Sequence, residues 1–375
     1  MSIQSVKTSH FRNLLDTDVT LGSRFNIIAG ENAQGKTNFL EALYLLTRFR
    51  SFRNAKVEEL IAFGEVDAEI QAEIIVGGLE HKLVVYCNSK GKKHTSNGKR
   101  ITAKNESLRQ LSAVLFTPDD LQIARRGGLQ RRNLIDHAVG ALWPAYALLL
   151  RDYGRALQSR NRLLKEQPVA LLELLEVYET QLSGLGAKII AARRRYLNVI
   201  GPSFSKTYRE ISKSGVEATM HYCADDEIEA LDNNTLDELK AVLLSLHQRH
   251  RQTDLARRIT TVGPHGDDLE LLLDGRSAKQ FASQGQNRSL ILSFKIAEIC
   301  EIKQQLDEYP ILLLDDVSSE LDPQRNGYLF DFLEEIPCQV VITTTRPQLI
   351  PVTKNRVDYQ VVRGDISKGK PFTAA

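Results

Sequence analysis

The chain has 375 residues, of which 42% are hydrophobic and 26% charged, so it is long enough to bury the cores of roughly two or three soluble domains. The formal net charge at pH 7 is only +2, which excludes nucleic-acid binding through a strong overall positive field and leaves only local patches. The first residues lack the basic start, apolar stretch and cleavage site of a signal peptide, and the apolar runs are too short to span a bilayer; we expect a cytoplasmic protein.

The cysteines give no pattern of a metal or disulfide framework. Cys87, Cys223, Cys300 and Cys338 are far apart in the sequence, without a CxxC pair. We noted no histidine at metal-ligand spacing and therefore expect buried, reduced thiols without zinc.

The first part of the chain predicts strands around one amphipathic helix. Residues 25–29 form a short apolar run that is typical of a buried strand, and an amphipathic helix is expected from Lys36 to about Arg50. Residues 68–76 and 79–86 alternate as two strands, joined by a hairpin at Gly77-Gly78. Another strand is expected at residues 113–117.

The middle of the chain carries apolar residues at heptad-like spacing on two consecutive helices. One seam runs from Tyr146 to Leu164 and the other from Leu171 to Tyr196, with Gln167-Pro168 breaking the chain between them. A helix of about 20–30 residues is roughly 30–45 Å long, so the pattern predicts a helical-hairpin arm, a short antiparallel coiled coil. Strand signals and a helix at about 236–249 follow.

The last part returns to alternating strands and helices. Strands are expected at residues 268–273, 311–314 and 340–344, with a helix over 287–306. The simplest architecture is an α/β head built from both ends of the chain, with the arm inserted. We expect one head part at 1–140, the arm at 141–258 and a second head part at 259–375.

A complete P-loop pattern, G-x-x-x-x-G-K-[ST], lies between the first strand and its helix. It reads Gly30-Glu31-Asn32-Ala33-Gln34-Gly35-Lys36-Thr37. Its glycines let backbone N–H groups point at phosphate oxygens, its lysine reaches the β and γ phosphates, and its threonine hydroxyl binds Mg²⁺. We predict ATP and Mg²⁺ as cofactors and count Asn38, the next residue, with the nucleotide-binding positions.

An acidic pair follows the apolar strand at residues 311–314. Asp315 at the strand end is expected to hold Mg²⁺ through water, and Asp316, on the other side of the pleat, to polarise the attacking water. Lys36, Asp315 and Asp316 are thus the predicted catalytic residues. An acidic turn after any buried strand is the plainer alternative.

A second candidate phosphate site lies in Ala282-Ser-Gln-Gly-Gln286, just before a helix. Ser283, Gly285 and Gln286 could hold a phosphate at that helix N-terminus. One chain needs only one phosphate cradle, so the second predicts a two-fold homodimer that shares two ATP molecules. A polar loop that merely caps its helix is the alternative.

Short runs of basic residues suggest where DNA could bind. Two acid-free runs suit sequence-independent contacts with duplex phosphates, and they contain Lys90, Lys92, Lys93, Lys99, Arg100, Arg131 and Arg132. Glycine turns at Gly91 and Gly98 should place several of the lysines on loop tips. Each run could instead be a solvated charged face, and Arg131 and Arg132 could support the ATP site. A third run, Arg193-Arg194-Arg195, lies on the arm.

The order of these motifs resembles the ABC ATPases, and the head-and-arm layout resembles their SMC-like branch. Within that branch the chain is similar to the RecF family over essentially its whole length. The matching stretches are Phe11-Arg12-Asn13, the P-loop, residues 116–121, Arg131-Arg132, Gly263-Pro264-His265, residues 283–286 and residues 314–317.

The resemblance implies an ATP-dependent DNA-binding protein of recombinational and replication-gap repair. Such a protein dimerises with ATP on duplex or gapped DNA, hydrolyses ATP slowly as a weak DNA-dependent ATPase, and assists RecA loading together with RecR and RecO. Asp322 would lie at the dimer seam. The alternatives are another SMC-like ATPase that supports a nuclease or chromosome organisation, a transporter ATPase, and a nucleotide-binding scaffold.

Three positions depart from the wider ABC pattern or from the family. Asp316 replaces the usual glutamate, which suggests slow turnover, and threonines at 343–345 replace the switch histidine. Gly266 stands where the family usually has arginine. We assign the glutamine loop to residues 117–120.

Overall fold

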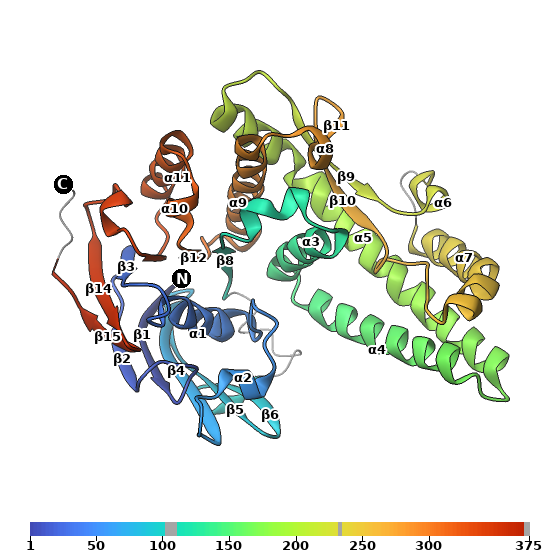
Figure 1. Cartoon of the computed structure of the whole chain (residues 1–375), viewed down its shortest axis with the longest axis horizontal. Helices are drawn as coiled ribbons and strands as arrows, with labels where there is room; N and C mark the ends of the chain where they lie inside the picture. Colours follow the sequence, from blue (N-terminus) through green and yellow to red (C-terminus); the bar gives the residue numbers. More distant parts are fainter. Residues whose placement is uncertain (102–110, 232–234, 371–375) are drawn as a thin grey trace. The chain divides into compact units, whose positions relative to one another are not determined.

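The structure, a computed structural model, describes residues 1–101, 111–231 and 235–370 (Figure 1). The chain divides into two compact units. Unit 1 contains Met1–Leu121 and Ile291–Ala375, and unit 2 contains Gln122–Leu290. Unit 1 is built from both ends of the chain, and unit 2 is inserted between them, which is the expected layout. The bounds of the two units differ from the predicted domain bounds.

The first sheet of unit 1 is mainly parallel and carries the P-loop. Its strand order is β15-β14-β3-β13-β12-β8, with only the β14–β15 pair antiparallel. The strands are β3 (Phe25–Ala29), β8 (Ala113–Phe116), β12 (Ile311–Asp315), β13 (Val340–Thr344), β14 (Arg356–Val362) and β15 (Asp365–Lys368). Every residue of β3, β8, β12 and β13 is buried, as their continuous apolar runs predict.

The second sheet of unit 1 is antiparallel, in the order β2-β1-β4-β5-β6-β7. Its strands are β1 (Ser2–Ser9), β2 (Thr17–Thr20), β4 (Asp67–Val76), β5 (Leu79–Asn88), β6 (Gly91–Ser96) and β7 (Lys99–Arg100). Val76 pairs with Leu79 across Gly77-Gly78, which confirms the predicted hairpin. The alternation of buried and more exposed residues along β4 follows the period of two.

Helix α1 (Lys36–Arg48) packs against strands of both sheets of unit 1. Its hydrophobic residues between Phe39 and Leu46 join one core with Ile70 and Val85 of the antiparallel sheet and Leu313 and Val341 of the parallel sheet. This placement explains why α1 is buried on nearly all sides. The other described helices that lie wholly in this unit are α2 (Val57–Leu60), α10 (Val317–Glu320), α11 (Pro323–Glu335) and the 3₁₀ turn η3 (Pro347–Leu349).

Unit 2 contains long helices and a small antiparallel sheet, β11-β10-β9. The elements are α3 (Gly128–Leu142), α4 (Ala145–Glu166), α5 (Leu171–Ser212), β9 (Ala218–Cys223), α6 (Asp226–Glu229), α7 (Leu236–Arg257), β10 (Asp268–Leu273), β11 (Arg276–Ser277) and α8 (Ala278–Phe281). The turn η2 (Asp120–Arg125) begins at the end of unit 1, and α9 (Gln284–Leu306) continues from unit 2 into unit 1.

The predicted hairpin is present, but it is not an isolated pair of helices. Helix α4 ends at Glu166, its C-cap residue Gln167 adopts a positive φ of 47°, and α5 follows after a short turn. At 42 residues, α5 is longer than expected, and it packs against α7 as well as α4. The guanidinium of Arg160 explains part of this packing: fully buried, it bonds Glu179 of α5 and Asp254 of α7.

Pairing across the insertion explains why the unit bounds differ from the expected domains at 1–140, 141–258 and 259–375. Strand β10 pairs with β9, and α3 packs on β10 and α5, so α3 and β10 both belong to unit 2. Strand pairing between distant segments cannot be read from local periodicity.

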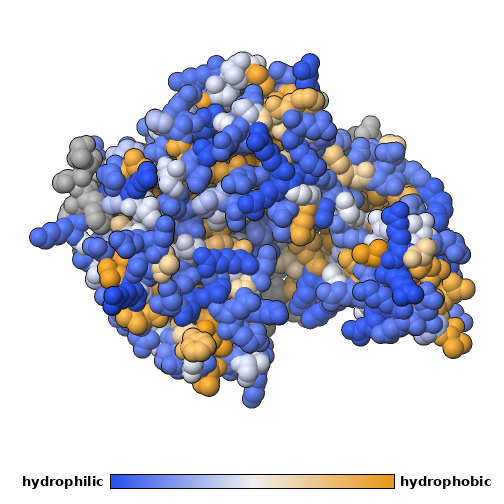
Figure 2. Space-filling model, viewed as in Figure 1, coloured by the Kyte–Doolittle hydropathy of each residue, from blue (hydrophilic) through white to orange (hydrophobic). Residues whose placement is uncertain are grey.

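The visible face in Figure 2 is mostly polar, with scattered apolar residues. In the part of the chain that the structure describes, no helix combines the length and the apolar character needed to cross a membrane.

Candidate functional site

The P-loop leaves β3 through backbone positions that only glycine can occupy. A Cβ on Gly30 would lie 2.5 Å from the carbonyl oxygen of Val361 in β14. Gly35 has a φ of 115°, and a Cβ there would lie 2.9 Å from Leu14 Cδ2. Both glycines of the motif are therefore required by local structure, as well as by close approach of a phosphate.

The N-terminus of α1 is left open toward the loop. Gly35 is its N-cap residue, and no side chain caps it. Lys36, only 6% exposed, donates from Nζ to the carbonyl oxygens of Gly30 and Glu31, each at 2.7 Å. Burial lowers the pKa of the Lys36 ammonium, against the opposing effect of Asp316 and Asp315. Uncapped amides beside a buried cation make this helix end an anion site.

Asp315 at the end of β12 meets the P-loop threonine. Thr37 Oγ1 donates to Asp315 Oδ1 at 2.8 Å, and Thr343 Oγ1 of β13 donates to the same oxygen at 2.7 Å. Burial raises the pKa of the Asp315 carboxyl, and these two hydrogen bonds oppose the rise. The Thr37 hydroxyl and the Asp315 carboxylate are oxygen donors of the kind that Mg²⁺ takes, and their hydrogen bond places them beside each other, where the motif implies the ion.

Asp316 lies beside the same pocket, whereas the strand pleat had predicted that it points to the other side. Its φ of 50° places it in a left-handed turn that ends the strand, and its amide donates to Thr343 O at 3.0 Å. The turn, which local alternation cannot predict, is the physical reason for the difference. Within the described residues, the buried Oδ1 of Asp316 has no hydrogen-bond partner, as expected of a group that meets a ligand or water.

These groups line a pocket of about 300 Å³ within unit 1. Its lining residues are Asn13, Asn32, Ala33, Gly35, Lys36, Thr37, Asn38, Arg53, Pro118, Asp315 and Asp316. Pro118 belongs to the stretch 117–120 that was assigned to the glutamine loop, where the Thr117 amide donates to Asp120 Oδ2 at 2.9 Å. The pocket therefore collects most of the nucleotide-binding residues predicted for unit 1.

Arg53 and Asn13 were not predicted as site residues. Arg53 donates to Asn38 Oδ1 at 2.8 Å, and Asn13 Nδ2 donates to the P-loop carbonyl of Ala33 at 3.2 Å. Arg53 follows α1 in an irregular segment and belongs to no motif. Asn13 lies in the stretch Phe11-Arg12-Asn13, so the family resemblance was the one signal that could have found it.

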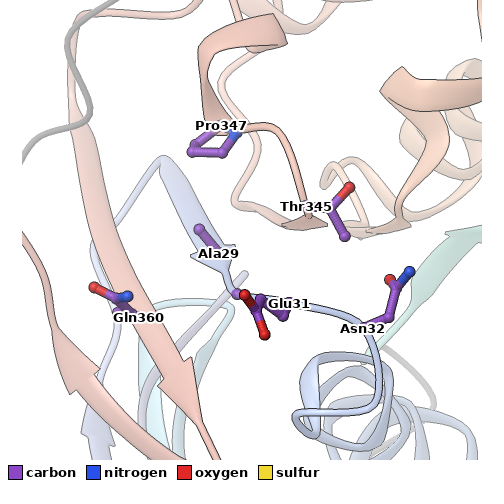
Figure 3. Close-up of a pocket in the computed structure, with 7 residues that line it drawn as sticks. Ala29, Glu31, Asn32, Thr345, Pro347 and Gln360 are labelled. Atoms are coloured by element: carbon purple, nitrogen blue, oxygen red, sulfur yellow. The ribbon is translucent and has the colours of Figure 1, made fainter.

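A second pocket of about 450 Å³ borders the same loop (Figure 3). It is lined by Ala29, Gly30, Glu31, Asn32, Thr345, Pro347 and Gln360. In Figure 3, Thr345 and Pro347 face Glu31 across the cavity, and Gln360 extends from β14. Glu31 and Asn32 of the P-loop thus border this cavity, and Thr345 and Pro347 of the segment after β13 form part of its wall.

The predicted signature residues lie in unit 2 and cap α9. Ser283 N donates to Gln286 Oε1 at 2.8 Å, and Gln286 N donates to Ser283 Oγ at 3.1 Å. This is a capping box, the plainer alternative considered for the segment. It leaves the Ser283 hydroxyl proton for another acceptor, because a hydroxyl both donates and accepts. Asp322 likewise caps its helix, accepting from Arg325 N at 3.0 Å.

The predicted DNA-binding lysines lie on the edge of the antiparallel sheet. Lys90, Lys93, Lys99 and Arg100 are exposed, on turns or on β6 and β7. Lys92 is half-buried, and burial lowers the pKa of its ammonium. Lys104, which follows these residues in the sequence, lies outside the described residues.

The arginines of the other basic runs are largely engaged inside unit 2. Arg131 is buried, and its Nε donates to Asp268 Oδ1 at 2.8 Å; Arg132 donates to Asp267 O at 2.5 Å. Arg193 is also buried and bonds Asp136. A DNA contact by Arg131 would require its ion pair to open, so its position favours a structural role.

A family profile, curated relatives and solved structures all point to the same family. The profile of the RecF/RecN/SMC N-terminal domain matches residues 2–368. A DNA replication and repair protein RecF of Myxococcus xanthus is 36% identical over 353 residues, covering 93% of this chain and 92% of the relative. The RecF of Citrifermentans bemidjiense is 38% identical over 346 residues, covering 92% and 93%.

Solved structures agree. The structure described as "the recombination mediator protein RecF-ATP in RecFOR pathway" matches with a TM-score of 0.86 and 30% identity, covering 98% of this chain and 97% of that chain. An SMC head bound to the C-terminal winged-helix domain of ScpA matches with a TM-score of 0.54 at 16% identity, over 98% of both chains, which shows a shared fold alone. The chain belongs to the RecF family, with the SMC-like ABC ATPase fold that its motifs predicted.

Proposed function

We propose that this chain is an ATP-dependent DNA-repair protein that binds ATP and Mg²⁺ in the pocket beside the P-loop. The observation that carries the proposal is the 2.8 Å hydrogen bond between Thr37 and Asp315, which joins the P-loop to the strand-end carboxylate next to an uncapped helix. The ATP complex of a RecF relative, named in its description, supports the same ligand.

In this proposal Lys36, Thr37, Asp315 and Asp316 have distinct roles in the pocket. The amides at the start of α1 bind the phosphates, and Lys36 exchanges its two carbonyl partners for phosphate oxygens. Thr37 and Asp315 hold Mg²⁺, which neutralises charge that develops on the phosphates. Asp316, whose Oδ1 is buried without a partner in the described structure, orients the attacking water.

The second phosphate-binding element acts in a dimer. Ser283, Gly285 and Gln286 contact the ATP bound to another copy of the chain, so that neither copy alone completes the hydrolysis centre. The capping box supports this, because Gln286 N–H holds the Ser283 oxygen while the hydroxyl proton remains able to donate to a phosphate.

DNA binds through phosphate contacts from the exposed cations of β6, β7 and their turns. Lys90, Lys93, Lys99 and Arg100 form this surface in our proposal, and its flexible side chains favour duplex or gapped DNA without sequence preference. By family, the bound dimer works with RecR and RecO to assist RecA loading on gapped DNA. Slow, DNA-stimulated hydrolysis then sets how long the dimer stays bound.

Sedimentation of the full chain with ATP or ADP, each with Mg²⁺, tests the shared site. We expect dimers with ATP and monomers with ADP, and faster ATP turnover when gapped duplex DNA is added. A chain that stays monomeric at saturating ATP, Mg²⁺ and DNA contradicts the shared site.

Gel shifts on duplex, gapped and single-stranded DNA test the surface. The double variant Lys90→Ala and Lys99→Ala should weaken binding and reduce the slope of log K against log salt by about 1 for each phosphate that a lysine no longer neutralises. The matched control is Lys188→Ala with Lys213→Ala, which removes the same charge from exposed positions of unit 2. Equal salt slopes in the two double variants would show that Lys90 and Lys99 do not contact DNA phosphates.

A further inference from the structure

A cluster of metal-ligating side chains lies in unit 2 and shares no residue with the nucleotide pocket. His221 and Cys223 alternate along β9 and therefore project from the same face of the strand. Glu229 reaches them from the end of α6, with its Oε2 3.4 Å from His221 Nε2. One ligand atom from each of the three residues lies within 4.8 Å of the others.

A fourth donor comes from the neighbouring strand. Glu270 of β10 pairs directly with His221 of β9, so the two side chains share a face of the small sheet. The Sγ of Cys223 lies 3.9 Å from Glu270 Oε2. Two elements thus bring one nitrogen, one sulfur and one carboxylate oxygen together, and a third element places the Glu270 carboxylate beside the sulfur.

We propose that His221, Cys223, Glu229 and Glu270 bind a Zn²⁺-like divalent cation. Tetrahedral zinc takes nitrogen, sulfur and oxygen ligands at about 2.0–2.3 Å, which places adjacent ligand atoms about 3.3–3.7 Å apart. The separations of 3.4 Å between His221 and Glu229 and 3.9 Å between Cys223 and Glu270 are close to that spacing, and the ligand atoms of His221, Cys223 and Glu229 all lie within 4.8 Å of one another. Only small movements of exposed or half-buried side chains are needed to close the site.

The surroundings of the cluster favour a cation. The carboxylates of Glu229 and Glu270 lie beside the Cys223 thiol. A divalent cation would neutralise part of this negative charge. Glu229 is already oriented, because Ala224 N donates to its Oε1 at 2.8 Å and leaves Oε2 facing the histidine.

The cluster also explains why cysteine spacing gave no indication of zinc. The cysteines are far apart in the sequence and form no CxxC pair, which is the usual sequence signal of a zinc site. Here His221 is two residues from Cys223 on a strand, and Glu270 joins them only through strand pairing. The inferred ion would tie β9, β10 and α6 together within unit 2.

Titration of the full chain with Co²⁺ under reducing conditions, without nucleotide, tests the proposal. A thiolate ligand gives Co²⁺ an intense near-ultraviolet charge-transfer band, which an ion held only by P-loop oxygens does not produce. We expect the band to saturate at about one equivalent and Zn²⁺ to displace it. Absence of a charge-transfer band in the wild-type protein would overturn the site.

Variants separate this site from adventitious binding. Cys223→Ser should abolish the band. His221→Gln should weaken Zn²⁺ binding by more than about tenfold, because removing even a residue that only hydrogen-bonds a metal ligand typically costs that much affinity. Cys300→Ser, which changes an exposed cysteine outside the cluster, should leave both unchanged. Far-ultraviolet circular dichroism checks folding of each variant. A band that survives in Cys223→Ser, or Zn²⁺ affinity unchanged in the folded His221→Gln protein, would overturn the proposal.

Discussion

The N-termini of α1 and α9 are two helix ends proposed for the same task, and they differ in how their backbone groups are satisfied. Gly35 precedes α1 without a side-chain cap, and a buried lysine lies beside it. At α9, Ser283 and Gln286 exchange hydrogen bonds, which satisfy the amides of these two residues within the chain. The α1 end thus offers unpaired donors, whereas the α9 end is stable on its own.

In the proposed dimer, one nucleotide would contact two helix ends of different kinds. An uncapped N-terminus leaves donors that favour an anion, so the α1 end gains most from a phosphate. A capped N-terminus keeps its capping hydrogen bonds when no nucleotide is bound. This suits a surface that, in the proposed dimer, contacts the nucleotide only after a second copy of the chain has bound. The α1 end should therefore govern binding and chemistry, and the α9 end should govern association.

The largest effect is expected from Lys36→Arg. The guanidinium keeps the charge but cannot reproduce the compact ammonium that lies 2.7 Å from two loop carbonyls. ATP hydrolysis should fall by about 100-fold or more, while part of the ATP binding remains. Turnover and nucleotide-binding assays check this, with Lys188→Arg as the matched control; normal hydrolysis in Lys36→Arg would exclude the P-loop assignment.

Asp316→Asn should slow hydrolysis by about 100-fold and trap the ATP-bound dimer, because the amide cannot polarise water as a carboxylate does. Single-turnover hydrolysis and sedimentation with ATP measure the two effects. Rapid turnover in this variant would show that Asp316 does not act in catalysis.

Ser283→Arg sharpens the distinction between binding and association. The large cation should block ATP-dependent dimers and lower turnover by about tenfold or more, with ATP binding to the single chain retained. Ser214→Arg, at an exposed position in unit 2, serves as the control. ATP-dependent dimers of normal strength in Ser283→Arg would refute the shared site.

The smallest effect concerns the cap itself. Ser283→Ala removes the acceptor for Gln286 N–H and should destabilise the first turn of α9 by about 1 kcal/mol, whereas Ser283→Thr retains a capping hydroxyl. Hydrogen exchange of the α9 amides measures the difference. Equal protection in the two variants would mean that the capping box contributes little in solution.

Much of unit 1 was predictable because its signals are local. The P-loop, the apolar strands and the Gly77-Gly78 hairpin follow from short-range pattern, and the structure confirms those elements. Arg53 could not be found in this way, since it enters the pocket from an irregular segment. The direction of Asp316 was predicted wrongly because a left-handed turn replaces the pleat at the strand end.

By itself the sequence determined the residues that form the P-loop, the strand that carries Asp315, and the break between α4 and α5, because each depends on neighbours a few residues apart. Only the tertiary structure decided that Arg131 and Arg193 are buried in ion pairs, that α7 joins α5, and that Glu270 meets His221 and Cys223. Those outcomes depend on strand pairing and packing between segments far apart in the chain, where burial sets the role of a charged side chain.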